Sequence, residues 1–294
     1  MFRVVMLGSG AAIPSPDRCV SCVGIRHKGS VYLLDACEGV QRQMMRFKLS
    51  YYRTAAVFIS HLHPDHYLGL PGLIYTLQLS DFNGTLEIIG PRGTQEVVHG
   101  LMNGRVPAFV KVHEFSGAMQ VYTGDGFTVK SFRAEHGIEA YGFVLQQDSK
   151  VKFNEKKAKA LGIQGPMFSE MLRNGKITVN GKEILLSDVS RVVRGRRIVY
   201  SGDTVYSEGT IIEAEGADLL IHDATFTEQH RKDADMKMHA TALDAARVAS
   251  AAKCKRLILT HISNRYDDTA AHLKEAKMAF RRARVAKDGL ELDI

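Results

Sequence analysis

The chain has 294 residues, of which 45% are hydrophobic and 24% charged, with a net charge of +7. These values are ordinary for a globular protein with a full core. No apolar run reaches the ~18 residues of a membrane span, the first residues lack the basic flank of a signal peptide, and four cysteines are too few for a disulfide scaffold. We therefore exclude membrane, collagenous, disordered and disulfide-rich secreted proteins, and expect a cytoplasmic protein.

Eight short apolar runs, bounded by Gly, Pro, Asp or His, predict strands. In chain order they are Phe2–Leu7, Val31–Leu34, Ala55–Ile59, Leu86–Ile89, Phe127–Phe132, Arg197–Tyr200, Leu219–Ile221 and Leu257–Leu259. Helical spacing lies between them at Thr94–Met102, where Thr94 is the expected N-cap, at Thr241–Ala251 and at the alanine-rich Ala270–Arg284. The mixture predicts an α/β fold with both sheet faces covered, in one domain over residues 1–294.

The positive charge is concentrated in residues 150–197. This segment holds twelve basic and four acidic residues, whereas the rest of the chain holds 27 and 28. Its periodicity is interrupted at Gly162, Gly165, Pro166, Gly175 and Gly181, which predicts an insertion. Clustered positive charge favours a polyanion such as nucleic acid. A solvated basic loop of no special purpose is the alternative.

Histidine and aspartate side chains follow several of the predicted strands. They are His61, His63, Asp65, His66, His136, Asp203, His222 and His261. Loops at strand ends can hold side chains convergently, so we predict a single site at a sheet edge. The remaining histidines are interpreted as packed or solvated, and Cys19 and Cys22 as buried free thiols.

Imidazole nitrogens and carboxylate oxygens are the ligands of zinc and similar divalent ions. His61 and His63 point the same way in an extended segment, and Asp65 and His66 fall on the following turn. Without His222, the residues listed above are seven potential ligands, which is too many for one tetrahedral ion. Two ions that share Asp203 would use all seven: His61, His63 and His136 on one, and Asp65, His66 and His261 on the other. Such a pair activates water at a phosphodiester.

These residues resemble the signature of the metallo-β-lactamase superfamily, His-x-His-x-Asp-His followed by later His, Asp and His. Further segments, in family order along nearly the whole chain, are similar to the ribonuclease Z family, the endonucleases that remove the 3′ trailer from precursor tRNA. They include LGSGAAIPSPDR, LLDACEGVQRQMMR, SHLHPDHYLGLPGLI, AEHGIEAYGFVL, KAKALGIQGPMFSEMLRNGK, SGDT, HDATF, MHATALDAARVA and LTHISNRY.

The resemblance implies an αββα sandwich with a protruding basic arm, residues 150–197, that grips the tRNA body. It implies two zinc ions on His61, His63, Asp65, His66, His136, Asp203 and His261, with Asp65 also the catalytic acid/base. It further implies a homodimer and products with a 3′-hydroxyl on the tRNA. The family's His-Glu-Ala-Thr reads His222-Asp223-Ala224-Thr225 here.

We add one hypothesis about the leaving group. A ribose 3′-oxygen leaves poorly unless it is protonated, and His239 is the candidate donor, oriented by Asp223. An alternative function is a related metallo-hydrolase that acts on small phosphodiesters or a thioester. A weaker alternative is a non-catalytic, metal-dependent RNA-binding protein, which would keep the basic arm but would not need Asp65.

Overall fold

The structure, a computed structural model, describes the whole chain from Met1 to Ile294. It divides into two compact units, residues 1–146 with 196–294, and residues 147–195. Neither contains a helix whose length and apolar character would suffice to cross a lipid bilayer.

The larger unit contains two seven-stranded sheets. The first has the order β18 (Glu291–Asp293), β1 (Arg3–Gly8), β2 (Cys22–His27), β3 (Ser30–Leu34), β4 (Thr54–Phe58), β5 (Leu86–Pro91) and β6 (Val110–Phe115). The second has the order β17 (Ala283–Val285), β16 (Leu257–Thr260), β15 (Leu219–Asp223), β14 (Arg197–Tyr200), β9 (Ala140–Gln147), β8 (Phe127–Ala134) and β7 (Gln120–Gly124). Strands β14 to β17 are parallel, so the loops after them leave from one edge of this sheet.

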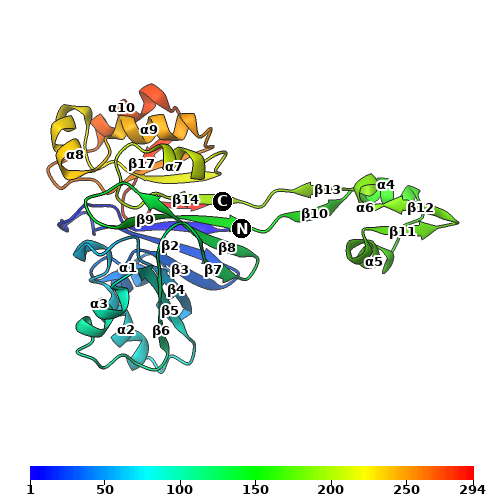
Figure 1. Cartoon of the computed structure of the whole chain (residues 1–294), viewed down its shortest axis with the longest axis horizontal. Helices are drawn as coiled ribbons and strands as arrows, with labels where there is room; N and C mark the ends of the chain where they lie inside the picture. Colours follow the sequence, from blue (N-terminus) through cyan, green and yellow to red (C-terminus); the bar gives the residue numbers. More distant parts are fainter. The chain divides into compact units, whose positions relative to one another are not determined.

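Helices cover the outer face of each sheet (Figure 1). On the first sheet they are α1 (Val40–Arg46), α2 (Leu70–Leu79) and α3 (Thr94–Leu101). On the second they are α7 (Glu208–Glu213), α9 (Ala242–Ala251) and α10 (Ala270–Ala279), with α8 (Arg231–Lys237) nearby in the chain. Short 3₁₀ helices lie at η1 (Tyr51–Arg53), η2 (Pro64–His66) and η3 (Glu228–His230).

Three apolar layers hold this unit together. The central layer lies between the sheets and combines first-sheet residues such as Phe58 with second-sheet residues such as Phe143 and Ile258. The other two layers bury the helices against the outer faces. Because each sheet is buried on both faces, its strands read as near-continuous apolar runs. The arrangement is the expected αββα sandwich.

The smaller unit contains an antiparallel ladder, a hairpin and three helices. Its elements are β10 (Lys150–Phe153), α4 (Glu155–Ala160), α5 (Met167–Asn174), β11 (Lys176–Val179), β12 (Lys182–Leu185), α6 (Leu186–Val189) and β13 (Ser190–Val193). β10 pairs with β13, and β11 with β12. Six buried side chains form a separate core: Ala158, Ile163, Met171, Ile177, Ile184 and Val189.

All eight predicted strands are present, but two helix predictions were wrong in detail. Thr94 is the first residue of α3 and not its cap, because Gly93, at φ 93°, precedes it and the Thr94 hydroxyl donates to the Pro91 carbonyl. The helix expected over Ala270–Arg284 ends at Ala279. The chain then turns at Phe280 and forms β17, because Ala283 pairs with Leu257 at the edge of the second sheet.

Candidate metal centre

Loops from both sheets bring the predicted ligands to one edge of the sandwich. The segment 61–66 follows β4 of the first sheet, and its last residues form the 3₁₀ helix η2. His136, Asp203 and His261 follow β8, β14 and β16 of the second sheet. The site therefore lies where the edges of two sheets meet.

The backbone at two of these loop positions is in the left-handed region. Gly202, at φ 62°, turns the chain so that Asp203 faces the site, and a Cβ atom there would lie 2.8 Å from the Tyr141 carbonyl oxygen. His261 itself has φ 59°. For a residue other than glycine this conformation costs ~1–3 kcal/mol and is concentrated at functional sites.

A first group of ligand atoms comes from His61, His63, His136 and Asp203, all within 4.8 Å of one another. His61 Nε2 lies 3.0 Å from His63 Nδ1, and His136 Nε2 lies 3.2 Å from the same atom. Asp203 Oδ2 is 3.6 Å from His61 Nε2. Three imidazole nitrogens and a carboxylate oxygen thus lie close together, and zinc accepts a set of four donors of this kind.

A second group comes from Asp65, His66 and His261. Asp65 Oδ2 lies 3.4 Å from His66 Nε2 and 3.5 Å from His261 Nε2. Asp203 Oδ2 is 3.3 and 3.2 Å from the same two nitrogens, so a single oxygen borders both groups. The Nε2 atoms of His66 and His261 are buried and have no hydrogen-bond partner. A buried nitrogen without a partner costs free energy unless a cation or proton satisfies it, so these donors fit a metal ion.

The other nitrogen of four histidines is held by an oxygen atom. His61 Nδ1 contacts the Ser60 hydroxyl at 3.0 Å, and His136 Nδ1 the Met238 carbonyl at 2.9 Å. His261 Nδ1 contacts the Thr225 hydroxyl at 2.8 Å. Contacts of this kind fix the tautomer and ring orientation of metal-ligating histidines, which supports the ligand assignment.

Asp35 holds the fourth, His66, and the sequence analysis did not single it out. It is fully buried and accepts hydrogen bonds from His66 Nδ1 at 2.7 Å, from the Ser60 amide and hydroxyl at 2.7 and 2.9 Å, and from the Tyr200 hydroxyl at 2.6 Å. Asp35 follows β3 directly. The strand-end rule that found the ligands could therefore have found it.

Opposite charges control the protonation states at this edge. Burial alone would lower the pKa of His66, but Asp203, Asp35 and Asp65 raise it well above its usual range. Burial alone would raise the pKa of Asp203, yet His261 and His66 hold it well below its usual range. Burial lowers the pKa of His61 well below its ordinary value, which favours the neutral imidazole that a metal ion requires.

Asp223 and His239 form a hydrogen-bonded pair, and their ligand atoms lie within 4.8 Å of those of Asp203 and His261. Asp223 Oδ2 lies 2.7 Å from His239 Nδ1, and its carboxylate is further held by the amides of Thr204 and Thr225 at 3.1 and 2.8 Å. The His239 ring stacks on that of His261, with centroids 5.0 Å apart. Burial opposes protonation of His239, but Asp223 raises its pKa to about 9. His239 thus carries a proton at neutral pH.

The other histidines and the cysteines considered from the sequence lie outside the groups of possible metal ligands. The His222 ring is buried against its neighbour's backbone, with Nδ1 2.7 Å from the Asp223 carbonyl oxygen. His27, His99, His113, His230 and His272 are absent from the groups of possible ligands. All four cysteines are free; Cys19 is half-buried and Cys22 is buried.

Comparison with known proteins identifies the family. The Beta-lactamase superfamily domain model matches residues 31–153 and 188–262. The chain is similar to ribonuclease Z of Methanosarcina acetivorans, at 37% identity over all of this chain and 98% of that protein. It is also similar to ribonuclease Z of Thermococcus kodakarensis, at 40% identity over 90% of this chain and 85% of that protein.

A solved structure gives the same result. The crystal structure of human tRNase Z, short form, superposes with a TM-score of 0.72 at 28% identity, over 99% of both chains. Sequence and fold therefore agree along the full length. The chain belongs to the ribonuclease Z family of endoribonucleases, within the metallo-β-lactamase superfamily.

Proposed function

We propose that this chain is a zinc-dependent endoribonuclease that removes the 3′ trailer of precursor tRNA by phosphodiester hydrolysis, leaving a 3′-hydroxyl on the tRNA. The observation that carries the catalytic part is Asp203 Oδ2, which lies 3.2–3.6 Å from imidazole nitrogens of both ligand groups. The choice of precursor tRNA as the substrate is supported by the relatives, which are named ribonuclease Z and tRNase Z.

Two ions would be held by the seven side chains in the partition described above, with Asp203 between them. Bound there, they would supply Lewis acidity, both for activating a water molecule and for neutralising charge on the phosphate. The donors are nitrogen and carboxylate oxygen, a set that suits zinc and contains no thiolate.

Asp65 is the acid/base in this proposal. Burial opposes its ionisation, but His66 and His261 hold the pKa of Asp65 well below its usual range, so it is a carboxylate at neutral pH. The Ala12 amide donates to Asp65 Oδ2 at 3.0 Å and fixes its orientation. A held carboxylate at the ligand cluster can accept the proton of the attacking water.

His239 is the proton donor to the leaving ribose oxygen. Because Asp223 raises its pKa to about 9, the imidazolium form predominates at neutral pH. Nδ1 is occupied by Asp223, which leaves Nε2 to present the proton. Asp223 acts only through His239 and is a positioning residue.

The smaller unit supports a polyanionic substrate. Its basic side chains are exposed, and they outnumber the acidic residues of the same segment; Lys159 and Lys176 make ion pairs with two of those acidic residues. Exposed cations in excess of nearby carboxylates bind phosphates and release counterions. We propose that this unit grips the tRNA body, and that the enzyme acts as a homodimer, as the family resemblance implies.

The test uses two substrates, each with and without a chelator. We expect the purified chain to cut labelled precursor tRNA at the trailer junction and to hydrolyse a chromogenic phosphodiester, with both activities lost on chelation and restored by zinc. His63→Ala should lose both, whereas His99→Ala, an exposed histidine on α3, should lose neither. Hydrolysis of the small substrate without any cleavage of precursor tRNA would favour the small-phosphodiester alternative.

A further inference from the structure

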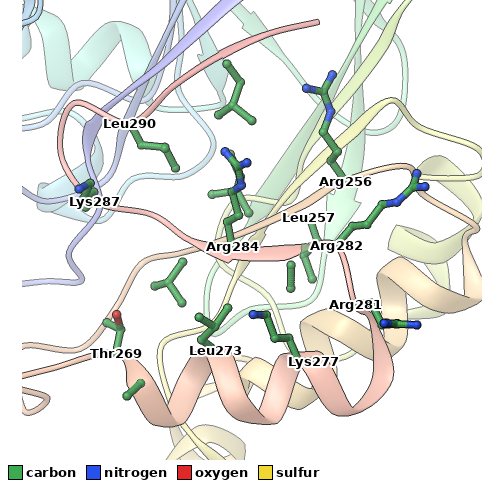
Figure 2. A pocket seen from close by; sticks show the side chains of 15 residues that line it. Arg256, Leu257, Thr269, Leu273, Lys277, Arg281, Arg282, Arg284, Lys287 and Leu290 are labelled. Atoms are coloured by element: carbon green, nitrogen blue, oxygen red, sulfur yellow. The ribbon is translucent and has the colours of Figure 1, made fainter.

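The larger unit carries a second basic feature, far along the chain from residues 150–197. A groove of about 700 Å³ lies between α10 and the edge strand β17 and continues to the C-terminal segment. Six cationic side chains line it, and no carboxylate does: Arg256, Lys277, Arg281, Arg282, Arg284 and Lys287. Figure 2 shows Lys277 rising from the helix toward the strand that carries Arg284.

Most of these cations are not neutralised. Arg256 is half-buried and donates to the Asp293 carbonyl at 3.1 Å. The side chains of the other five are exposed, and none makes an ion pair or a side-chain hydrogen bond. Such a cluster costs free energy through mutual repulsion, and a bound polyanion would remove that cost. The charge at this sheet edge therefore favours a ligand that carries phosphate groups.

The groove leads away from the metal centre. β16 and β17 are parallel and Leu259 pairs with Val285, so Lys287 follows β17 at the level where His261 follows β16. α10 runs back from Thr269, near this edge, to Arg281 and Arg282 at the opposite edge, and its ten residues span ~15 Å. One end of the groove therefore lies at the level of the sheet edge from which His261 follows β16.

The floor of the groove is apolar. Leu273, Val285 and Leu290 are half-buried and lie between the cations. A narrow apolar floor with charged walls suits a single strand, whose bases can turn inward while the phosphates meet the walls. No aromatic ring lines the groove, so stacking would be left to the guanidinium planes. We expect little sequence preference for that reason.

We propose that this groove binds the single-stranded 3′ trailer of the RNA as it leaves the metal centre. The proposal rests on the proposed function, because the trailer is the unpaired strand that adjoins the cleavage point. It assigns the two basic regions different parts of one substrate: residues 150–197 take the folded body, and the groove takes the strand to be removed.

The experiment compares two precursor tRNAs that differ only in the trailer, one nucleotide or a length that covers the whole groove. In Lys277→Glu/Arg281→Glu we expect kcat/KM to fall about tenfold for the long trailer and to change less than twofold for the short one. The slope of log kcat/KM against log salt should become shallower by about 1.4 for the long trailer only, because two contacts to a single strand are lost. The chromogenic phosphodiester should be hydrolysed as before.

Arg105→Glu/Lys111→Glu is the matched control, since both residues are exposed cations of the same unit outside the groove. It should not distinguish the trailers. Equal losses on both trailers in the groove variant, or no loss on either, would overturn the proposal.

A direct measurement separates this proposal from the function on which it rests. A fluorescent single-stranded RNA should bind the wild-type chain more tightly than the groove variant by about tenfold, with the control variant unchanged. If the wild type cuts neither precursor but shows this difference, the proposed function fails and the groove remains a single-strand site. An acidic peptide that competes with the RNA, while trailer length has no effect, would assign the groove to a protein partner instead.

Discussion

Asp35→Asn should weaken the metal centre although Asp35 is not among the proposed ligands. The carboxylate accepts four short hydrogen bonds, at 2.6–2.9 Å, from His66, Ser60 and Tyr200. An amide offers one oxygen with two lone pairs and points an NH₂ group at the remaining donors. At least two of the four hydrogen bonds are therefore lost. In addition, the NH₂ group of the asparagine faces N–H or O–H groups that are themselves donors.

The magnitude follows from burial. Asp35 is 0% exposed, so no water replaces the missing acceptor. Removing one partner from a buried charged pair costs about 3–5 kcal/mol of stability. Because His66 loses the contact that fixes its ring, metal affinity should fall about 10–100-fold. Tyr200→Phe removes only one donor and keeps the carboxylate, so it should cost less in both quantities.

The assay is competition between the protein and a chromophoric chelator for zinc, together with urea unfolding of the metal-free chain. Asp125→Asn is the control, since its carboxylate lies at the surface beside Lys28, and neither quantity should change. Asp35→Asn with wild-type zinc affinity would refute the reasoning, because it would show that His66 needs no oriented partner.

Further predictions concern the metal, the proton transfers and the smaller unit. Metal analysis should find close to two zinc-class ions per chain; one ion with full activity would contradict the sharing of Asp203. Asp65→Ala should lower kcat about 10²–10⁴-fold, the usual range for an acid/base, while the Kd for precursor tRNA stays nearly constant; a parallel loss of binding would contradict the separation of roles. Asp223→Asn removes the negative neighbour that raises the pKa of His239 to about 9, so the alkaline limb of the kcat profile should move to lower pH, and an unchanged limb would exclude His239 as the donor. Replacing residues 154–189 by Asn-Gly should preserve hydrolysis of a chromogenic phosphodiester and raise KM for precursor tRNA, because Phe153 and Ser190 are opposite each other in the ladder and a two-residue turn can join them; unchanged tRNA cleavage would leave the basic segment without a role.

The eight predicted strands are mostly buried, but burial alone was not sufficient, since β2 (Cys22–His27) and β9 (Ala140–Gln147) were missed although they are largely buried as well. Leu257–Leu259 and Leu219–Ile221 are continuous apolar runs because helices cover one side of these second-sheet strands and the first sheet covers the other. β6 was missed because its side chains are largely exposed and polar. β17 was missed because alanine and arginine favour helix locally, whereas pairing with β16 decides the conformation.

The same contrast applies to the site. The seven candidate ligands could be proposed from the sequence because histidine and aspartate recur at several strand ends, and the structure brings them close together. Tyr200 and Thr225 could not, since a tyrosine at the end of an apolar strand and a threonine after an aspartate have many ordinary explanations. Their roles come from long-range contacts, such as the Tyr200 hydroxyl donating to Asp35 across 165 positions of the chain. The basic groove was not predicted, because the charge count compared residues 150–197 with the rest of the chain as a whole. The positive charge of residues 256–287 was thereby averaged with the acidic residues elsewhere.

The separate core of the smaller unit bears on how the enzyme responds to heat. Six buried side chains, all between Ala158 and Val189, stabilise these 49 residues without help from the large apolar layers. A core of that size is marginal, and the least stable part of a protein opens first. On warming, this unit should melt before the sandwich and its metal ligands. With the roles proposed above for the two units, the chain would then still hydrolyse small phosphodiesters but bind precursor tRNA less tightly, so that its substrate range would depend on temperature.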